Sequence, residues 1–182
     1  MLGAVALLLL SGCARPVSPQ ERDLFVTGQD LRRVNCDTGR PGRGRFSKQQ
    51  VPFVYEAIDY KLNATGDAVS CKVVIAATVI AARDARTAIG VYGGGVGGAR
   101  IGLDTHRIKL VEAKRQFHYG DQSQYFDLTK NGRVVGLYFQ ARLGRVVYQY
   151  LVFGLRFTTA DSFAKLFEPK LELTRERYAD RG

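Results

Sequence analysis

The chain of 182 residues lacks tryptophan and contains only two histidines, three cysteines and one methionine. Zinc sites usually present histidine or cysteine ligands in tight pairs, whereas His106 and His118 stand far apart in the sequence. The sequence also has no G-x-S-x-G nucleophile elbow and no G-x-x-x-x-G-K-[ST] phosphate loop. We therefore expect two ordinary surface histidines, assign no catalytic residue, metal or cofactor, and favour a non-enzymatic role.

Long apolar runs are also scarce. The nine residues 2–10 form an uninterrupted apolar run, and no charged residue precedes Arg15. A run of this length is too short to cross a bilayer, which takes about 20 apolar residues. It has the length and composition of the apolar region of a secretory signal peptide. The alternative is a buried helix or strand at the N-terminus.

Small residues separate this run from a cysteine, in the tetrad Leu10-Ser11-Gly12-Cys13. The tetrad resembles the lipobox of bacterial lipoproteins. The resemblance implies that residues 1–12 are removed and that Cys13 carries acyl chains inserted in a membrane. Ala14, which is not an aspartate, implies by the same resemblance a lipid-anchored protein on the periplasmic face of the outer membrane. The expected localisation is the cell envelope.

Assigning Cys13 to the lipid leaves one pair of cysteines, Cys36 and Cys71. Exported proteins occupy an oxidising compartment in which disulfides persist. We therefore predict a Cys36–Cys71 disulfide, with two buried free thiols as the alternative.

Acidic residues are fewer than basic ones, with 17 Asp and Glu against 27 Lys and Arg, for a net charge of +10. An exported protein meets little nucleic acid, so we expect anionic envelope polymers or lipids as partners. The glycine-rich and proline-containing segment 37–48 is predicted to be a loop. It supplies the candidate anion-binding residues Arg40, Arg43, Arg45 and Lys48, because arginine binds phosphate and carboxylate bidentately. The alternative is a solvated basic connector.

Strand signals begin after this segment. Residues 53–62 are rich in aromatic and β-branched side chains, and residues 71–81 alternate with period two. Asn131-Gly132 separates two further apolar segments and favours the positive φ angles of a type I′ hairpin. Together with residues 146–157, these segments predict a meander of at least three antiparallel strands.

Helices are expected at both ends of the chain. Residues 21–34 predict a modest helix that Gly28 weakens, after a tether over residues 14–20. Residues 158–167 predict a helix that begins with a Thr158–Asp161 capping pair and is stopped by Pro169. The charged residues 172–181 predict an exposed tail.

Seven glycines lie between positions 90 and 102, four of them spaced by four residues. Each glycine costs about 1 kcal/mol relative to alanine inside a helix. We therefore predict a loop here, with a helix packed closely on a partner or a bilayer as the alternative.

These expectations describe an α+β domain, an antiparallel sheet with a C-terminal helix on one face. The strand-then-helix ending is similar to the α/β/α sandwich of the PsbP and Mog1 proteins. The predicted division is a signal peptide (1–12), a lipidated tether with the basic loop (13–48), one α+β domain (49–170) and a charged tail (171–182). The predicted function is binding or scaffolding by a membrane-anchored lipoprotein. Alternatives are an envelope hydrolase acting on glycans or lipids, or a carrier of a small apolar ligand.

Overall fold

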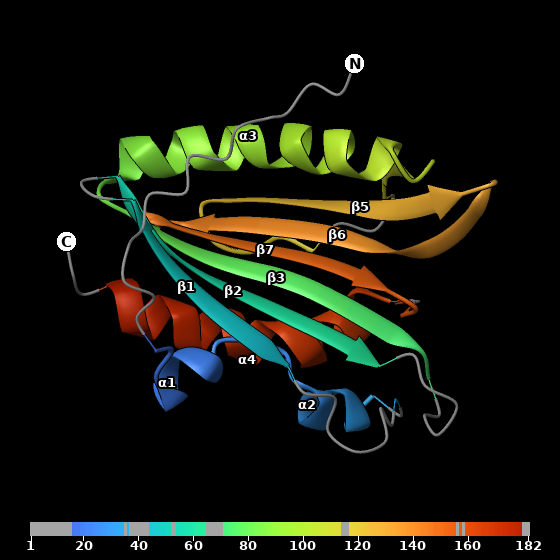
Figure 1. The fold of residues 1–182 in the computed structure, drawn as a ribbon, viewed down its shortest axis with the longest axis horizontal. Coiled ribbons are helices and arrows are strands. Elements are labelled where there is room, and N and C mark those ends of the chain that lie inside the picture. The colour runs from blue at the N-terminus through green and yellow to red at the C-terminus, as the bar shows by residue number, and fades with distance from the viewer. Residues whose placement is uncertain are drawn as a thin grey trace.

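The computed structural model describes residues 16–34, 36, 44–51, 54–64, 71–113, 117–155, 157 and 159–179. Its centre is a seven-stranded sheet with helices on both faces (Figure 1). The strands are β1 (Arg45–Val51), β2 (Tyr55–Ala64), β3 (Val73–Ala82), β4 (Lys109–Glu112), β5 (Gln122–Lys130), β6 (Arg133–Leu143) and β7 (Val146–Phe153). Their spatial order is β1-β2-β3-β7-β6-β5-β4, and every neighbouring pair is antiparallel. The predicted α+β class and antiparallel meander are confirmed.

The predicted hairpin joins β5 to β6. Asn131 and Gly132 form its two-residue turn, with φ angles of 52° and 73°. A type I′ turn needs positive φ at both central positions, and asparagine and glycine tolerate it best. Gly144, with φ 55°, opens the second predicted reversal between β6 and β7.

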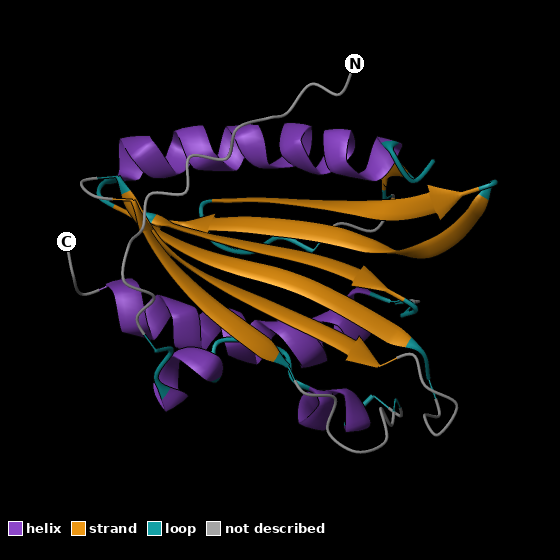
Figure 2. Ribbon diagram, in the orientation of Figure 1, coloured by secondary structure: helices purple, strands orange, loops and turns teal. Residues whose placement is uncertain are grey.

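The alternating strand predicted over residues 71–81 is β3. Its residues Val73, Ile75, Ala77 and Val79 all belong to the large core on one side of the sheet. Helices α1 (Pro19–Arg22), α2 (Gly28–Arg32) and α4 (Ala160–Ala179) cover this side (Figure 2). Helix α4 packs through aromatic rings, with Phe167 edge-on to Tyr150 at 4.9 Å and stacked on Phe163 at 4.4 Å.

The prediction that Pro169 ends the last helix is wrong, since α4 continues to Ala179. A proline inside a helix removes one backbone hydrogen bond and strains the preceding turn. Leu171, Thr174 and Tyr178 are buried beyond it, so packing holds the second half of α4 in place. The predicted exposed tail is confirmed only in part: these residues continue α4, and Leu173, Arg175 and Glu176 are exposed whereas Thr174 and Tyr178 are buried. Thr159 caps the helix by accepting from the Ser162 amide at 3.2 Å, while Thr158 lies outside the described residues.

The N-terminal residues form two short helices rather than one, and Gly28 opens the second. Part of the predicted tether belongs to the core, since Val17 is buried together with Phe25 and Leu31. Two buried tyrosines of β7 hold this segment to the sheet. Tyr150 accepts a hydrogen bond from the Val26 amide at 2.7 Å, and Tyr148 donates one to the Leu24 carbonyl at 3.0 Å.

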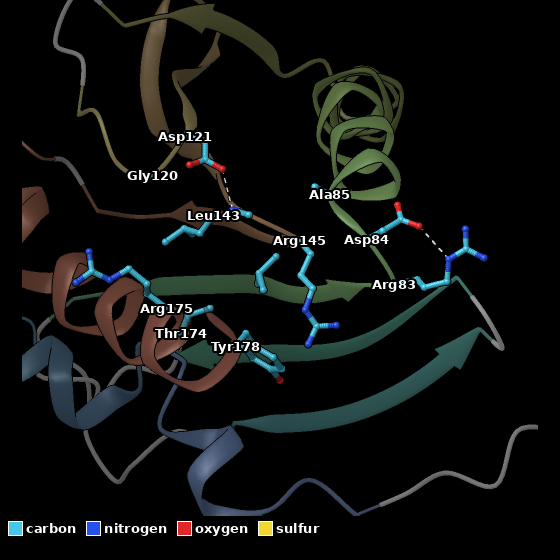
Figure 3. Close-up of a pocket in the computed structure, with 12 residues that line it drawn as sticks. Arg83, Asp84, Ala85, Gly120, Asp121, Leu143, Arg145, Thr174, Arg175 and Tyr178 are labelled. Atoms are coloured by element: carbon cyan, nitrogen blue, oxygen red, sulfur yellow. Dashed lines mark hydrogen bonds and ion pairs between the residues drawn. The ribbon is translucent and has the colours of Figure 1, made fainter. Parts of the chain in front are cut away.

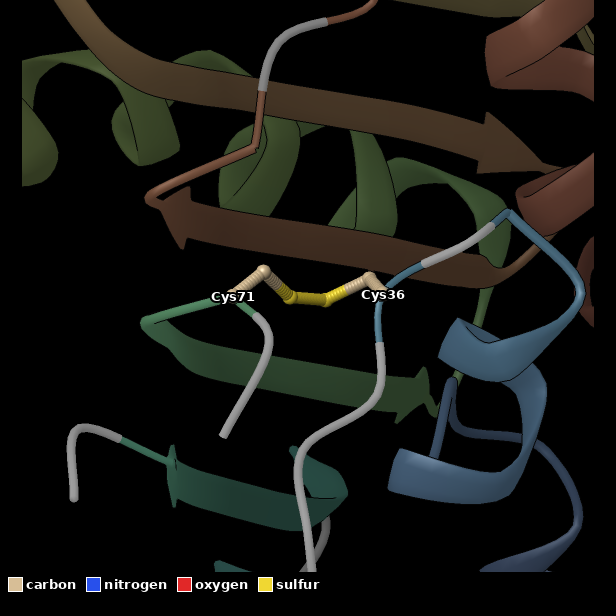
Figure 4. Close-up of a disulfide and its surroundings, with 2 residues drawn as sticks. All are labelled: Cys36 and Cys71. Carbon is tan, nitrogen blue, oxygen red and sulfur yellow. A yellow bond between two sulfur atoms is a disulfide. The ribbon is translucent and has the colours of Figure 1, made fainter. Parts of the chain in front are cut away.

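The predicted Cys36–Cys71 disulfide is present (Figure 4). It joins the segment that follows α2 to the residues just before β3, with 5.4 Å between the two Cα atoms. Closing a loop over a separation of 35 residues stabilises a fold by about 4 kcal/mol through the entropy of the unfolded chain.

The glycine-rich segment is helix α3 (Ala85–Asp104), so the predicted loop is wrong. Asp84 caps its first turn by accepting from the Thr87 amide at 2.8 Å. The helix lies across the second face of the sheet (Figure 1), with Ala88, Tyr92 and Leu103 buried against it. These contacts offset the roughly 1 kcal/mol that each glycine costs in a helix. The sheet is therefore the middle layer of three.

Candidate functional site

A pocket of about 720 Å³ opens where four segments of the chain meet at one end of the sheet (Figure 3). They are the junction of β3 with α3, the residues just before β5, the turn between β6 and β7, and the C-terminal half of α4. Its lining residues are Arg83, Asp84, Ala85, Gly120, Asp121, Leu143, Gly144, Arg145, Val146, Thr174, Arg175 and Tyr178.

Three arginines line this pocket. Among the described residues, Arg145 is the one of the three that has no carboxylate partner. One terminal nitrogen of its guanidinium donates to the Ala82 carbonyl at 3.3 Å. Its Nε is buried and has no hydrogen-bond partner among the described atoms. The side chain extends between Tyr178 and Arg83 (Figure 3). A guanidinium normally binds an anion through Nε and a terminal nitrogen together, whereas the Nε of Arg145 is covered by protein atoms, so a small turn of the side chain is needed before both nitrogens can face the pocket.

The other two arginines of the pocket are already paired. Arg83 contacts Asp84 at 2.9 Å, and Arg175 contacts Glu172 at 3.0 Å. The backbone amide of Thr87 and the Arg83 guanidinium lower the pKa of Asp84 to about 2, so it stays ionised at neutral pH. Both pairs are solvent-exposed and lie at the rim.

A rigid turn forms one wall of the pocket. Asp121 accepts from the Gly144 amide at 2.8 Å and pairs with the Arg142 guanidinium at 2.9 Å. Arg142 also donates to the Gly144 carbonyl at 2.9 Å. At Gly120, where φ is +70°, a Cβ atom would collide with the Arg142 carbonyl. These contacts preorganise this wall of the pocket.

Apolar surface forms the remainder of the pocket. Leu143, Val146 and Ala85 contribute aliphatic groups, and the buried Tyr178 contributes an aromatic ring. Burial raises the pKa of Tyr178, so its phenol stays neutral. An apolar wall beside one unpaired guanidinium suits a ligand that has an acidic head and an apolar body.

The residues predicted for the site do not line this pocket. Cys13, Arg40 and Arg43 lie outside the described residues. Arg45 and Lys48 belong to strand β1, so the predicted loop is wrong from Arg45 onward. Regular pairing of β1 with β2 places these residues in the sheet.

Lys48 is held by two carboxylates, Glu21 at 2.8 Å and Glu56 at 3.0 Å, and its side chain is 12% exposed. Burial disfavours its charge, but the hydrogen bonds to these carboxylates outweigh that effect and raise the pKa of Lys48. The charge of Lys48 therefore helps to hold α1 against the sheet. Arg45 is exposed, and anion binding by Arg40, Arg43 and Arg45 stays a prediction.

Sequence reasoning missed Arg145 because nothing local distinguishes it. It follows Gly144 in a predicted turn, where an arginine is normally a solvated side chain. Its role depends on α4 and the β3–α3 junction, which lie far away in sequence.

Both histidines are exposed, as predicted. Within the described ranges, no group of three or more His, Cys, Asp or Glu side chains is arranged to hold a metal ion. None of the helices in that part of the chain is long and apolar enough to cross a membrane. No protein-family model, curated protein or solved structure matches this chain.

Proposed function

We propose that the protein is a membrane-anchored cell-envelope lipoprotein whose domain binds, without chemical turnover, an acidic ligand that carries an apolar group. The observation that carries this proposal is the guanidinium of Arg145, which lines the pocket beside its apolar wall and has no carboxylate partner among the described residues. The anchoring part rests on the tetrad Leu10-Ser11-Gly12-Cys13.

Energetics support a ligand at Arg145. Leaving a buried donor without a partner costs about 1–3 kcal/mol, more for a charged group. A carboxylate or phosphate in the pocket neutralises the guanidinium, and a turn of the Arg145 side chain toward it gives Nε an acceptor and removes this cost. Each apolar group that enters the pocket beside Val146 adds about 25 cal/mol per Å² of surface removed from water.

Calorimetric titration with three probes of equal chain length tests the pocket. We expect the full chain to bind laurate and dodecyl phosphate, and to bind uncharged dodecanol at least tenfold more weakly. Arg145→Gln should weaken laurate binding about tenfold or more, because a charge-assisted hydrogen bond contributes about 1.5–3 kcal/mol. The matched control is Arg133→Gln, since Arg133 is exposed at the opposite end of β6.

Equal affinity for laurate and dodecanol would contradict an acidic-head site. Unchanged laurate binding by a folded Arg145→Gln variant would also contradict it. The thermal midpoint of each variant, measured in parallel, separates lost binding from lost folding.

The anchor is tested separately. Acyl chains contribute about 0.8 kcal/mol for each buried methylene, and two or more chains give stable attachment. We expect labelled palmitate to be incorporated into the wild type and not into Cys13→Ser, and the variant to leave the membrane fraction. A wild type without acyl label would refute the anchor while leaving the pocket proposal standing.

A further inference from the structure

Most glycines of helix α3 make no close contact with the sheet. Of its seven glycines, only Gly95 is held close to the sheet, where a Cβ atom would collide with the Gln140 and Gln149 side chains. At the other six, apart from the backbone of α3 itself, no atom of the described residues lies within 4 Å of the position that a Cβ would take; they are Gly90, Gly93, Gly94, Gly97, Gly98 and Gly102. Packing of α3 on the sheet therefore explains one glycine and not the rest.

Two large apolar side chains stand on the outward face of α3. Ile89 is 52% exposed and Ile101 is 75% exposed. Together with Gly93 and Gly97 they recur every four residues and form one stripe along the helix. The stripe thus has an isoleucine at each end and a flat glycine surface between them.

The stripe is symmetric about Gly95 in its chemistry. Ile89 and Ile101 lie equally far from Gly95 in sequence, as do Gly93 and Gly97. Of the three exposed charges of α3, Arg86 and Asp104 are also equidistant from it and carry opposite signs, whereas Arg100 has a glycine, Gly90, at the equivalent position. They are five helical turns apart, about 27 Å, which places both on the same side of the helix, and both are exposed.

We propose that this face binds the same face of a second copy of the chain, with the two α3 helices antiparallel around a two-fold axis near Gly95. In that arrangement Ile89 of each copy packs against Ile101 of the other, and Gly93 lies over Gly97. Arg86 of each copy meets Asp104 of the other at both ends. A parallel arrangement instead places like charges together, so charge selects the antiparallel one.

Glycine permits this contact because helix axes approach most closely where no side chain intervenes. A groove of about 410 Å³ beside Ile101 is lined by the charged Arg100, Asp104 and Lys109 and by the apolar Ile108 and Leu110, whose side chains add apolar surface next to the isoleucine contact. An interface built mainly from one helix of each copy is smaller than the standard size of about 1,600 Å². The dimer is therefore reversible and depends on concentration.

Cross-linking of the full chain tests the geometry. The double variant Arg86→Cys with Asp104→Cys should form a disulfide-linked dimer on a non-reducing gel, because the two positions meet only between copies. Each single variant should stay at the level of the parental chain, which has the same three native cysteines. A double variant that gives no more dimer than the parental chain overturns the proposal, as does equal cross-linking by either single variant.

A charge exchange tests the pairing by sedimentation. Arg86→Asp and Asp104→Arg should each weaken dimerisation about tenfold, and combining them should restore it. Gly93→Leu should also abolish the dimer, because its side chain holds the helices apart. Gly102→Leu is the matched control, since Gly102 is equally open but lies about 140° around the helix from Gly97. Failure of the combined charge variant to regain dimerisation, or equal loss in both leucine variants, refutes the antiparallel contact.

Discussion

The hydroxyl of Tyr150 offers the sharpest test of how the N-terminal segment is attached to the sheet. It accepts a hydrogen bond from the Val26 amide at 2.7 Å inside the core, where both residues are fully buried. Burial raises the pKa of Tyr150 far above its ordinary value, so the phenol is neutral at any pH at which the protein folds. Replacing Tyr150 by phenylalanine removes one oxygen and leaves the ring contacts with Phe167 intact.

The expected cost follows from the amide left behind. Leaving a buried donor without a partner destabilises the fold by about 1–3 kcal/mol, whereas the cavity left by a single oxygen atom adds little to this cost. Tyr150→Phe should therefore lower the free energy of unfolding in urea by that amount. For a chain of this size it should lower the melting temperature by roughly 2–4 °C per kcal/mol. Hydrogen exchange at the Val26 amide should accelerate as well.

Tyr55→Phe is the matched control, because Tyr55 is only half-buried at the start of β2. An effect of Tyr150→Phe below about 0.5 kcal/mol would contradict the reasoning, since that is the ordinary range of surface substitutions. An equal effect of Tyr55→Phe would show that the Val26 contact is not the cause.

Two further predictions concern pH and close packing. Burial disfavours the charge of Glu21, but hydrogen bonds from Lys48 and Ser18 outweigh this effect and hold the pKa of Glu21 below 4.5. The ionised Glu21 therefore stabilises the fold above pH 4.5, and this contribution is lost as the pH falls through the folded-state pKa. Urea titrations at pH 5 and pH 3 should therefore show a smaller acid-induced loss in Glu21→Gln than in the wild type, and parallel losses would disprove the pairing. Gly95→Ala should destabilise the fold by about 1–3 kcal/mol through collision with the sheet, whereas Gly102→Ala, in open space, should stabilise it by up to about 1 kcal/mol. Thermal melts that move both variants in the same direction would contradict this account of α3.

Local signals predicted the elements whose conformation depends on neighbours in sequence. The turn at Asn131-Gly132 demands positive φ, and the alternation in β3 reflects a strand that presents its large side chains to one face. The disulfide followed from pairing the two cysteines left after Cys13 was assigned to the lipid.

Elements that depend on distant contacts were not predictable in this way. Glycine content alone disfavours helix α3. The helix nevertheless forms, because Ala88, Tyr92 and Leu103 pack against the sheet, and no local sequence pattern predicts these contacts. Likewise, Pro169 is tolerated because Leu171 and Tyr178 are buried after it. The pocket is assembled from four separate segments, so no motif identifies it.

The antiparallel sheet has one seam between strands far apart in sequence, where β3 pairs with β7. Strands β1 to β3 come first along the chain and pair with one another, and β4 to β7 do the same. Until β7 has docked, one edge of the β3 backbone is unpaired. An unpaired edge invites association with other chains. Because Cys36 and Cys71 both precede β7 in the sequence, their bond does not depend on β7, and in an oxidising compartment it can restrain the first half of the sheet before the seam closes.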